Sequence, residues 1–400
     1  MRKKFLTLAL SSAALALASC AADASGESTD VAAVAGGEAI ELDETSPFVA
    51  HSYGSFDRPW ALDFDPVSGM IVLTEKSGTM KLVDPASGRT GAITGGIPAV
   101  RFEGQGGLGD VVFAPDFAQS GMIYLSWAKP DGEKMGRAAV GRGKLVCEDG
   151  GDCTIADFAQ IWQQEPASPT GRHYGHRIAF SPDGQHLFIS SGDRGLHDKV
   201  QDRGNTLGSV VRLLPDGTPA PGNPFADEPY PTNQIWSWGH RNPLGLAFNI
   251  DGELWDVEHG PAGGDELNLV KPGANYGWVA RSNGNHYNGT DIPDHTADDG
   301  FAKPAIFWDP VIAPGDMMFY SGEMFADWRG QALIANLAMQ SISRIAVDAA
   351  SNSATEEARY EFPMRLRGIA QGPDGAIWVI EDGEDGRLLR LTPKASAQGG

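Results

Sequence analysis

The sequence predicts an all-β protein, and specifically a six-bladed β-propeller. Three observations favour this class. One plan recurs along the chain: an apolar strand, a turn rich in Asp, Pro and Gly, and a second apolar strand. The Asp-Gly turns within the copies are strong hairpin signals. No long segment shows the 3.6-residue period of an amphipathic helix. Small sheets of this kind bury their faces by stacking radially. A two-sheet sandwich is the alternative, but it predicts no motif that recurs so regularly.

The copies of this plan follow one another with room for a four-stranded sheet and a variable loop in each. They begin at Ala61, Val111, Ile178, Leu246, Met324 and Ile369, and the fifth is the most degenerate. Two connections, between Asp131 and Arg177 and between Pro261 and Pro314, lack strong strand pairs. Loops of that length in compact domains are usually functional.

Composition sets the class of partner. The chain has 400 residues, 41% of them hydrophobic, which is enough to bury a large core. Acidic residues outnumber basic ones by 52 to 31, for a formal charge of −21. Such a charge repels phosphate backbones and anionic lipids, so we expect no nucleic-acid partner.

The amino terminus predicts export. Residues 1–19 join the basic stretch MRKK to a short apolar run, as in a secretory signal peptide, and the run is too short and serine-broken to span a membrane comfortably. The segment LASC is similar to the lipobox of bacterial lipoproteins, which predicts that Cys20 is lipidated; an ordinary cleavage site with a chance cysteine is the alternative. Residues 20–45 are small, polar and acidic, typical of a flexible tether. The predicted propeller domain covers 46–395, held on the periplasmic side of a membrane by the lipid alone.

The two other cysteines form an even pair. Cys147 and Cys153 stand in the segment CEDGGDC, and an exported protein meets an oxidising compartment. We therefore predict a disulfide between them. A metal site is the alternative, but it needs more thiol or imidazole groups than this segment offers.

Two polar residues flank the third repeat. His173 precedes its first strand, close to His176 and Arg177, and Asp193 follows its hairpin. If both ends turn toward one face, His173 and Asp193 are in reach of each other. A carboxylate that fixes the tautomer of an imidazole is the usual arrangement for a general base. A purely structural hydrogen bond is the alternative.

The fourth repeat is bounded by two further candidates. The turn GHRNPLG presents Arg241, a cationic fork that can hold an anionic oxygen. After the hairpin, Gly260 and Pro261 bend the backbone so that carbonyls can face a hard cation, with Asp265 and Glu266 as further oxygen ligands. The pattern predicts a calcium site, with an acidic surface loop as the alternative.

Arg365 and Arg367 precede the last repeat and alternate along a strand, so both project to the same side. Two neighbouring guanidinium groups repel each other unless an anion lies between them. They therefore predict a carboxylate or phosphate ligand, unless they are solvated charges at a sheet edge.

Taken together, several segments resemble the glucose/sorbosone dehydrogenases, in order, from about Phe56 to Pro393. The segments are GQGGLGDVVFAPDF, RHYGHRIAFSPDG, GDRG, WGHRNPLGLAF, EHGPAGGDELNLV, NYGW and RLRGIAQGPDGAIWVIED. The resemblance implies a six-bladed soluble quinoprotein, most similar to the bacterial aldose sugar dehydrogenases. These bind pyrroloquinoline quinone (PQQ) and calcium, and oxidise the C1 hydroxyl of aldose sugars to lactones. Electrons then pass to an external acceptor such as a quinone, a cytochrome or a dye.

The resemblance also implies roles for residues. His173 would take the hydroxyl proton and Asp193 would orient it, while Arg241 would stabilise the oxyanion that develops on the quinone. Asn242 would hydrogen-bond the cofactor, and Gln105 would touch substrate or cofactor.

Charged and carbonyl groups would complete the site. The resemblance implies that Arg365 and Arg367 clamp the cofactor carboxylates, that two carbonyls bind its calcium and that a second calcium lies in the neighbouring loop. The carbonyls are those of Gly260 and Pro261, and the second calcium would be served by Glu266 and Tyr276.

One position departs from the family. Relatives of the glucose enzyme carry a lysine in the fifth blade that pairs with the quinone acid, and the matching residue here is Ala338. The loss of that cation is expected to weaken cofactor binding by about 1 to 3 kcal/mol if the partner carboxylate is otherwise unpaired.

Two other functions remain possible on the propeller scaffold. A calcium-dependent lactonase or hydrolase would gather Glu, Asn and Asp ligands in the central channel, where this sequence presents arginines and a histidine. A non-catalytic binding propeller would be favoured if His173 or Arg241 were missing, and both are present.

Overall fold

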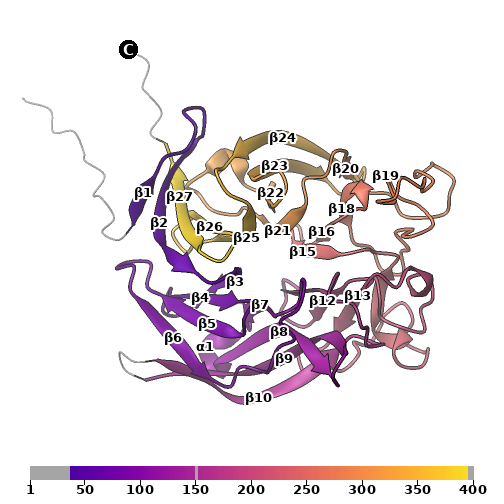
Figure 1. Cartoon of the computed structure of the whole chain (residues 1–400), viewed down its shortest axis with the longest axis horizontal. Coiled ribbons are helices and arrows are strands. Elements are labelled where there is room, and N and C mark those ends of the chain that lie inside the picture. Colours follow the sequence, from indigo (N-terminus) through magenta and orange to yellow (C-terminus); the bar gives the residue numbers. More distant parts are fainter. Residues whose placement is uncertain (1–36, 149–151, 395–400) are drawn as a thin grey trace, which may run out of the picture. The chain divides into compact units, whose positions relative to one another are not determined.

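Strands dominate the computed structural model, which describes residues 37–148 and 152–394 (Figure 1). Helical elements there are the short helix α1 (Phe117–Ser120) and the 3-10 turns η1 (His197–Lys199), η2 (Thr232–Gln234) and η3 (Ala326–Trp328). The prediction of an all-β protein is confirmed. No helix within these two ranges is long and apolar enough to cross a membrane. The predicted signal peptide and Cys20 lie outside the described residues.

The strands form two large sheets and several smaller ones. A five-stranded sheet has the order β1 (Glu38–Ile40), β2 (Phe48–Phe56), β27 (Gly386–Pro393), β26 (Ile377–Glu381) and β25 (Leu366–Gln371). An eight-stranded sheet has the order β3 (Pro59–Phe64), β4 (Ile71–Glu75), β5 (Thr79–Val83), β6 (Thr90–Gly95), β10 (Cys153–Gln163), β9 (Met135–Cys147), β8 (Met122–Asp131) and β7 (Leu108–Phe113).

Four-stranded sheets make up most of the rest. The first contains β11 (Gly175–Phe180), β12 (Leu187–Ser191), β13 (Ser209–Leu213) and β14 (Ile235–Trp238). The next contains β15 (Pro243–Phe248), β16 (Leu254–Glu258), β18 (Asp265–Leu269) and β20 (Ile306–Trp308). The last contains β21 (Pro314–Phe319), β22 (Ala332–Asn336), β23 (Ser341–Asp348) and β24 (Ser353–Glu361), and a small pair joins β17 (Ala262–Gly263) to β19 (Gly284–Asn285).

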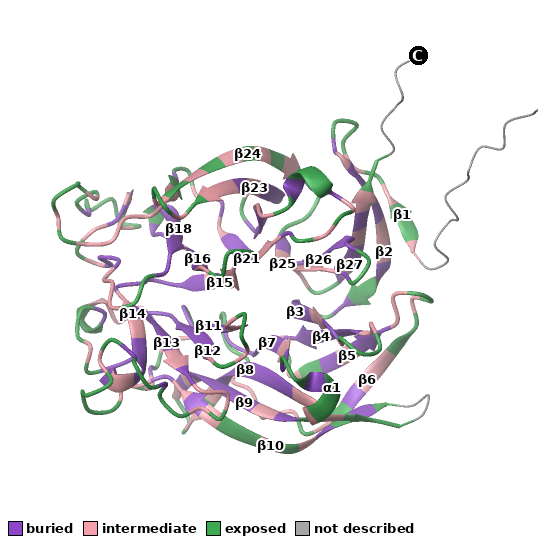
Figure 2. Ribbon diagram, turned by 180° about the vertical axis from the view of Figure 1, so that it is seen from behind, coloured by how far each residue is buried: buried purple, intermediate pink, exposed green. Residues whose placement is uncertain are grey.

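The predicted hairpin copies correspond to the strands nearest the centre. The first strands contact one another in a closed cycle, from β3 through β7, β11, β15, β21 and β25 back to β3 (Figure 1). The second strands β4, β12, β16, β22 and β26 are buried along their whole length, as Figure 2 shows for several of them. Their apolar side chains pack against the neighbouring sheet; Leu333 of β22, for example, shares a core cluster with Ile377 of β26. The radial stacking therefore builds the core between sheets.

The two ends of the folded body meet in one sheet. Strand β2 pairs antiparallel with β27, from Phe48 opposite Pro393 to Phe56 opposite Gly386. Strand β1 continues this sheet, with Glu38 opposite Ser52. The tether predicted over 20–45 is therefore too long, because β1 lies inside that range. Backbone hydrogen bonding to β2, which sequence composition does not report, draws these residues into the sheet.

One predicted loop is wrong. The chain between Asp131 and Arg177 contains the long strands β9 and β10, which pair antiparallel with each other. Glycines inside β9 obscure the strand pattern, yet they make room for its partner: a Cβ at Gly141 would lie 2.6 Å from the Phe158 ring. The loop predicted between Pro261 and Pro314 is also interrupted, since β18 is a fully buried strand there.

The predicted disulfide is confirmed. Cys147 ends β9 and Cys153 begins β10, where the two residues are register partners with their Cα atoms 4.1 Å apart. The fifth repeat begins earlier than predicted, since its first strand is β21, and the segment that starts at Met324 contains η3 instead.

Candidate active site

A cavity of about 620 Å³ opens where the first strands converge. Aromatic, amide and cationic side chains from several sheets line it, and no carboxylate belongs to the lining. The residues are Trp60, Lys76, Gln105, Tyr174, Gly175, His176, Asn242, Leu244, His259, Leu337, Arg365 and Arg367. We call it the central cavity. Its lining is cationic, so it is suited to an anionic ligand.

His173 and Asp193 lie at the edge of this cavity, at either end of the hairpin β11–β12. The His173 Nδ1 atom is 2.7 Å from Asp193 Oδ1. Because the carboxylate accepts, Nδ1 carries the proton, and Nε2 is left with the lone pair that a base needs. About 10% of the His173 side chain remains exposed, whereas Asp193 is fully covered. The structure thus brings the predicted pair together.

Asp193 is held from three sides. Its Oδ2 atom accepts a 2.7 Å hydrogen bond from the indole Nε1 of Trp278, and its Oδ1 atom accepts one of 2.6 Å from the amide of Gly195. These two bonds hold the Asp193 carboxylate in the orientation in which it accepts from His173. The contact of Trp278 with Asp193 was not predicted, because no pattern in the sequence near residue 278 points to residue 193.

The backbone of His173 is also constrained. Its φ is +51°, a left-handed value that is uncommon for a residue with a side chain, and its amide donates a 2.6 Å hydrogen bond to Gln105 Oε1. A Cβ at Gly192 would lie 2.1 Å from the His173 carbonyl oxygen, so only glycine permits this approach. Gln105, predicted to touch substrate or cofactor, therefore lines the cavity and also positions His173.

The protonation states suit a general base. Burial lowers the pKa of His173 below its ordinary value of 6.5, although the hydrogen bond and the charge of Asp193 act in the opposite direction. The pKa of Asp193 is also lowered: burial would raise it, but the hydrogen bond and charge of His173 outweigh that effect. At neutral pH the pair is therefore a neutral imidazole beside a carboxylate.

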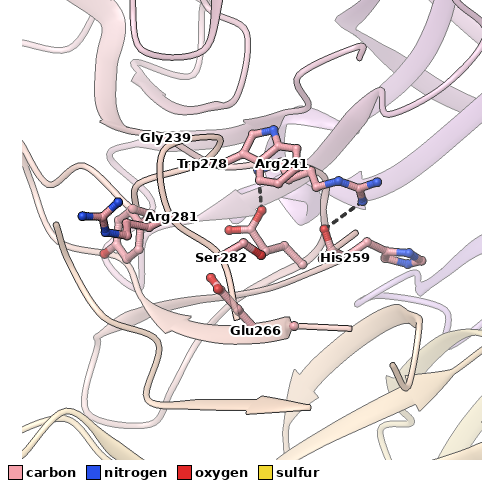
Figure 3. Close-up of a pocket in the computed structure, with 11 residues that line it drawn as sticks. Gly239, Arg241, His259, Glu266, Trp278, Arg281 and Ser282 are labelled. Atoms are coloured by element: carbon pink, nitrogen blue, oxygen red, sulfur yellow. Dashed lines mark hydrogen bonds between the residues drawn. The ribbon is translucent and has the colours of Figure 1, made fainter. Parts of the chain in front are cut away.

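Arg241 lies beside a second, smaller pocket of about 250 Å³ (Figure 3). Its Nη1 donates to the His259 carbonyl at 3.0 Å, and its Nη2 lies 3.3 Å from the hydroxyl of Tyr287. The Arg241 Nε is buried and has no hydrogen-bond partner. Its backbone amide donates to Glu258, which anchors the predicted turn. Arg241 is thus a fixed cation with one donor unused.

The smaller pocket differs from the central cavity because carboxylates line it, together with Arg241 and Arg281. Glu258 and Glu266 line it, and Asp256 lies directly behind them. We call Asp256, Glu258 and Glu266 the acidic cluster. Burial, and then the charge of Glu258, raise the pKa of Glu266 well above its ordinary value, and Asp256 is raised to about 7. Such a concentration of buried carboxylates is costly unless a cation or protons neutralise it.

His240 is the counterpart of this cluster. Its Nδ1 lies 3.0 Å from Glu258 Oε1 and 3.2 Å from Asp256 Oδ2. Its ring stacks on Tyr276 with the centroids 4.5 Å apart. Tyr276 lines the pocket beside Glu266, as its predicted role requires, but its hydroxyl donates to the Leu269 carbonyl and accepts from the Lys271 amide. The phenol is thus already committed to the backbone.

The loop at Gly260 and Pro261 closes the pocket. A Cβ at Gly260 would lie 2.2 Å from the Gly264 carbonyl oxygen, so the close packing of this loop requires glycine. Asp265, expected to be an oxygen ligand, has another role: its carboxylate accepts from the amides of Gly260 at 2.8 Å and Ala313 at 2.6 Å. Asp265 therefore shapes the loop, and its predicted role as an oxygen ligand stays a prediction.

Asn242 faces the central cavity, as predicted for a cofactor-binding residue. Its Oδ1 accepts a long hydrogen bond of 3.3 Å from the amide of Gly175, and its own amide lies 3.2 Å from Glu258 Oε2. The residue therefore links the hairpin that carries His173 to the acidic cluster.

Arg365 and Arg367 line the central cavity together, so the prediction that they share one side is confirmed. An internal carboxylate already lies between them, and the predicted anionic ligand stays a prediction. Asp382 accepts from Arg365 Nε at 3.0 Å and from Arg367 Nη2 at 2.9 Å. One internal carboxylate between two guanidinium groups still leaves a net positive charge.

Other residues of the site were not predicted. Lys76 lines the central cavity from the loop after β4. Ala338, the position where the resemblance implies a lysine, is exposed beyond β22 and does not line the cavity. His259 lines both pockets, and its Nε2 lies 2.7 Å from the Pro314 carbonyl. Burial lowers the pKa of His259 to about 3, so the ring is neutral.

His176 and Arg177 are structural. The His176 ring stacks on Trp60 at 5.0 Å and hydrogen-bonds Ser126. Arg177 forms ion pairs with Asp110 at 3.1 Å and Asp316 at 3.4 Å, which links strands of three sheets near the axis.

Comparison with known proteins agrees with this architecture. The family model for glucose/sorbosone dehydrogenases matches residues 56–390. The aldose sugar dehydrogenase YliI of Escherichia coli is 36% identical over 343 residues, which cover 84% of this chain and 91% of that protein. Quinoprotein glucose dehydrogenase B of Acinetobacter calcoaceticus is 30% identical over 250 residues, 56% of this chain and 50% of that one.

Solved structures extend the likeness to the fold. The apo form of the soluble E. coli aldose sugar dehydrogenase superposes with a TM-score of 0.80 at 34% identity, and covers 86% of this chain and 99% of that one. A PQQ-bound aldose sugar dehydrogenase from Streptomyces coelicolor gives a TM-score of 0.68 at 26% identity, over 90% and 99% of the two chains.

The described residues form an all-β ring of sheets with a histidine–aspartate pair, a cationic cavity and a pocket that contains buried carboxylates, as expected for a sugar dehydrogenase of this fold. The family match covers most of the chain, and this protein belongs to the glucose/sorbosone dehydrogenase family. The resemblance stated from the sequence motifs is therefore confirmed.

Proposed function

We propose that the protein is a PQQ- and calcium-dependent aldose sugar dehydrogenase, which oxidises the C1 hydroxyl of an aldose to a lactone and passes electrons to an external acceptor. The observation that carries the proposal is the neutral His173, held by Asp193, at the edge of a cationic cavity. Relatives named as aldose sugar dehydrogenases, one of them PQQ-bound, support it.

We also infer that the propeller has six blades. The eight-stranded sheet divides into two groups of four, β3 to β6 and β7 to β10, and the hydrogen bonds that join the two groups run between β6 and β10 at the rim. Counted so, the closed cycle of first strands has one member from each blade.

The central cavity suits PQQ, which is a tricarboxylate. Its lining supplies Arg365, Arg367 and Asn242, and Arg241, which lines the neighbouring smaller pocket, has a buried Nε without a partner. An unused buried donor is costly, and an anionic oxygen of the cofactor would satisfy it. A hydrolase that holds calcium through central acids is disfavoured, since the lining contains no carboxylate.

The acidic cluster suits a calcium ion. Glu258 and Glu266 line one pocket with Tyr276 and Gly260, and the buried Oδ1 of Asn268 has no hydrogen-bond partner. Carboxylate and amide oxygens are the ligands that calcium prefers. Two calcium ions are proposed. One lies in the acidic cluster beside Glu266, and the other, which contacts the cofactor, is bound by the carbonyls of Gly260 and Pro261.

PQQ, when bound, supplies the two-electron acceptor that takes a hydride from C1 of the sugar. The chain supplies the proton acceptor. His173 Nε2 takes the proton of the C1 hydroxyl, Asp193 stabilises the resulting imidazolium, and Trp278 and Gly195 keep Asp193 in place. The sugar thus loses a proton from its C1 hydroxyl and a hydride from its C1 carbon, and this two-electron oxidation converts the hemiacetal to the lactone. Arg241 would hold an anionic oxygen of the bound cofactor.

The test is reconstitution. The mature domain, prepared without Cys20, is mixed with PQQ and calcium, and dye reduction is measured with a panel of aldoses. We expect sugar-dependent reduction and a spectrum of protein-bound quinone. The absence of both would refute the proposal.

We further propose that the protein is exported and held at the periplasmic face of a membrane by lipid on Cys20. The basic and apolar stretch before that cysteine supports this proposal. Mass spectrometry of the amino-terminal peptide from the native host should show a diacylglyceryl group on Cys20. An unmodified peptide that begins elsewhere would contradict it.

A further inference from the structure

Lys76 is the one lysine that lines the central cavity among the described residues. It follows β4 directly, and its backbone is fixed at both polar groups: its amide donates to the Arg58 carbonyl at 3.1 Å, and its carbonyl accepts from the Leu108 amide at 3.1 Å. The close approach of Gly107 completes this anchor, since a Cβ there would lie 2.3 Å from the Lys76 carbonyl oxygen. The side chain therefore leaves from a rigid point on the cavity wall.

The ammonium group has a weak partner only. Its Nζ lies 3.3 Å from the carbonyl of Gly104, and the described residues place no carboxylate within 4.0 Å of it. Gly104 immediately precedes Gln105, the residue that holds the His173 amide. A half-buried ammonium with a single neutral acceptor is under-satisfied, because it can donate three hydrogen bonds.

The charges around Lys76 do not balance. Arg365 and Arg367 both donate to Asp382, so one carboxylate serves two guanidinium groups. Burial first, and then the charge of Arg367, lower the pKa of Lys76, while Asp382 acts in the opposite direction. With Lys76 included, this wall of the cavity presents three cations to one acid. A ligand with more than one carboxylate is the chemistry that neutralises such an excess.

We propose that Lys76 is a cofactor-binding residue, a third cation that pairs with a carboxylate of the quinone cofactor in the central cavity. The proposal rests on the proposed function, since it names the ligand of the same site. It places the contribution on the first repeat, on the side of the cavity that also carries Trp60. Lys76 takes no part in proton transfer, and its effect is on cofactor affinity.

The test is PQQ affinity of the apoprotein, measured by quenching of tryptophan fluorescence in the presence of calcium. Lys76→Met keeps most of the side-chain length and removes the charge. We expect it to raise the Kd for PQQ by about 10- to 100-fold, the range for loss of a charged hydrogen bond. Lys76→Arg restores the charge and should bind within a few-fold of the wild type. Lys144→Met, on the exposed surface of β9, is the matched control and should bind as the wild type.

A second measurement guards against loss of the fold. The Tm of the apoprotein should be unchanged or raised in Lys76→Met, because a partly desolvated charge is removed. If this variant binds PQQ within twofold of the wild type, Lys76 is not a ligand and the proposed function stands. If the wild type itself binds no PQQ, the proposed function fails and this assignment fails with it.

Discussion

The central cavity and the smaller pocket beside it differ in charge, although His259 lines both. The cavity presents Lys76, Arg365 and Arg367 around the single carboxylate of Asp382. The pocket presents Glu258 and Glu266, with Asp256 behind them and His240 as their basic partner. Arg241 and Arg281 also line it, but within the described residues neither forms an ion pair with these three carboxylates. Neither set is neutralised within itself.

The difference indicates two ligands of opposite charge on either side of a neutral imidazole. Burial keeps His259 uncharged, so it adds nothing to either charge set. A polyanionic cofactor in the cavity and a cation in the pocket would each relieve the excess on its own side. The charge pattern thus supports a quinone with calcium better than either ligand alone.

The strongest test removes the proposed base, His173, and leaves both charge sets intact. His173→Ala should lower turnover by about 10³-fold or more, because no other group is positioned to take the hydroxyl proton. PQQ affinity should stay largely unchanged, measured by fluorescence quenching beside steady-state dye reduction. Loss of PQQ binding in this variant would mean that His173 holds the cofactor.

The pH dependence of turnover sharpens the same comparison. His173 acts as a base only when neutral, and burial lowers its pKa below 6.5. The rate should therefore stay level as the pH falls from 8 to about 6.5 and decrease tenfold per unit only below the lowered pKa. A rate profile of log kcat/KM against pH measures this. A rate that already falls tenfold per unit above pH 7 would show that the pKa of His173 is not lowered.

The two arginines of the cavity should contribute unequally to PQQ affinity. The Arg367 side chain is 14% exposed and that of Arg365 is 48% exposed. Because water screens an exposed pair, Arg367→Met should raise the Kd for PQQ by about 100-fold, and Arg365→Met by less than about tenfold. Titration of both apoproteins at two salt concentrations compares them. Equal effects would argue that exposure does not set their contributions.

The acidic pocket is tested by calcium. A calcium concentration one hundredfold above Kd should stabilise the wild type by about 2.7 kcal/mol, and chelation should reverse this. Glu266→Gln should lose most of the calcium response, yet be no less stable than the wild type without calcium, because a buried like charge is removed. Thermal unfolding with and without chelator checks it. The exposed Glu361→Gln is the control, and a full calcium response in Glu266→Gln would remove this residue from the ligand set.

The smallest effect is expected at Ala338. A lysine there restores the cation that the family resemblance implies, but position 338 is exposed and the cavity already contains Lys76. Ala338→Lys should therefore improve PQQ affinity by less than about fivefold. A gain of 100-fold would show that the cavity lacks a cation that Lys76 does not replace.

The sequence predicted the parts of the site that are local. His173 and Asp193 flank one hairpin, and Arg365 and Arg367 lie two residues apart on one strand, so strand geometry alone brings each pair together. Contacts between sheets were not predictable in this way. Trp278 reaches Asp193 across 85 residues, and Asp382 lies opposite the arginines only because β25 and β26 pair. The position of Lys76 in the cavity lining was not predicted, because a single lysine in a turn is ordinarily a solvated charge. The strand β9 was missed because glycine and arginine interrupt its apolar pattern, and β10 because polar residues do so.

The pairing of β2 with β27 has a consequence for how the chain folds. The Lys394 ammonium contacts the Glu44 carbonyl across 350 residues of sequence, so the last sheet cannot form until the whole chain is available. Closing so long a loop is slow, and until it happens β2 and β26 are open sheet edges that can pair with other chains. The last sheet, and with it the closed cycle of first strands, therefore forms only after β25 to β27 have been synthesised.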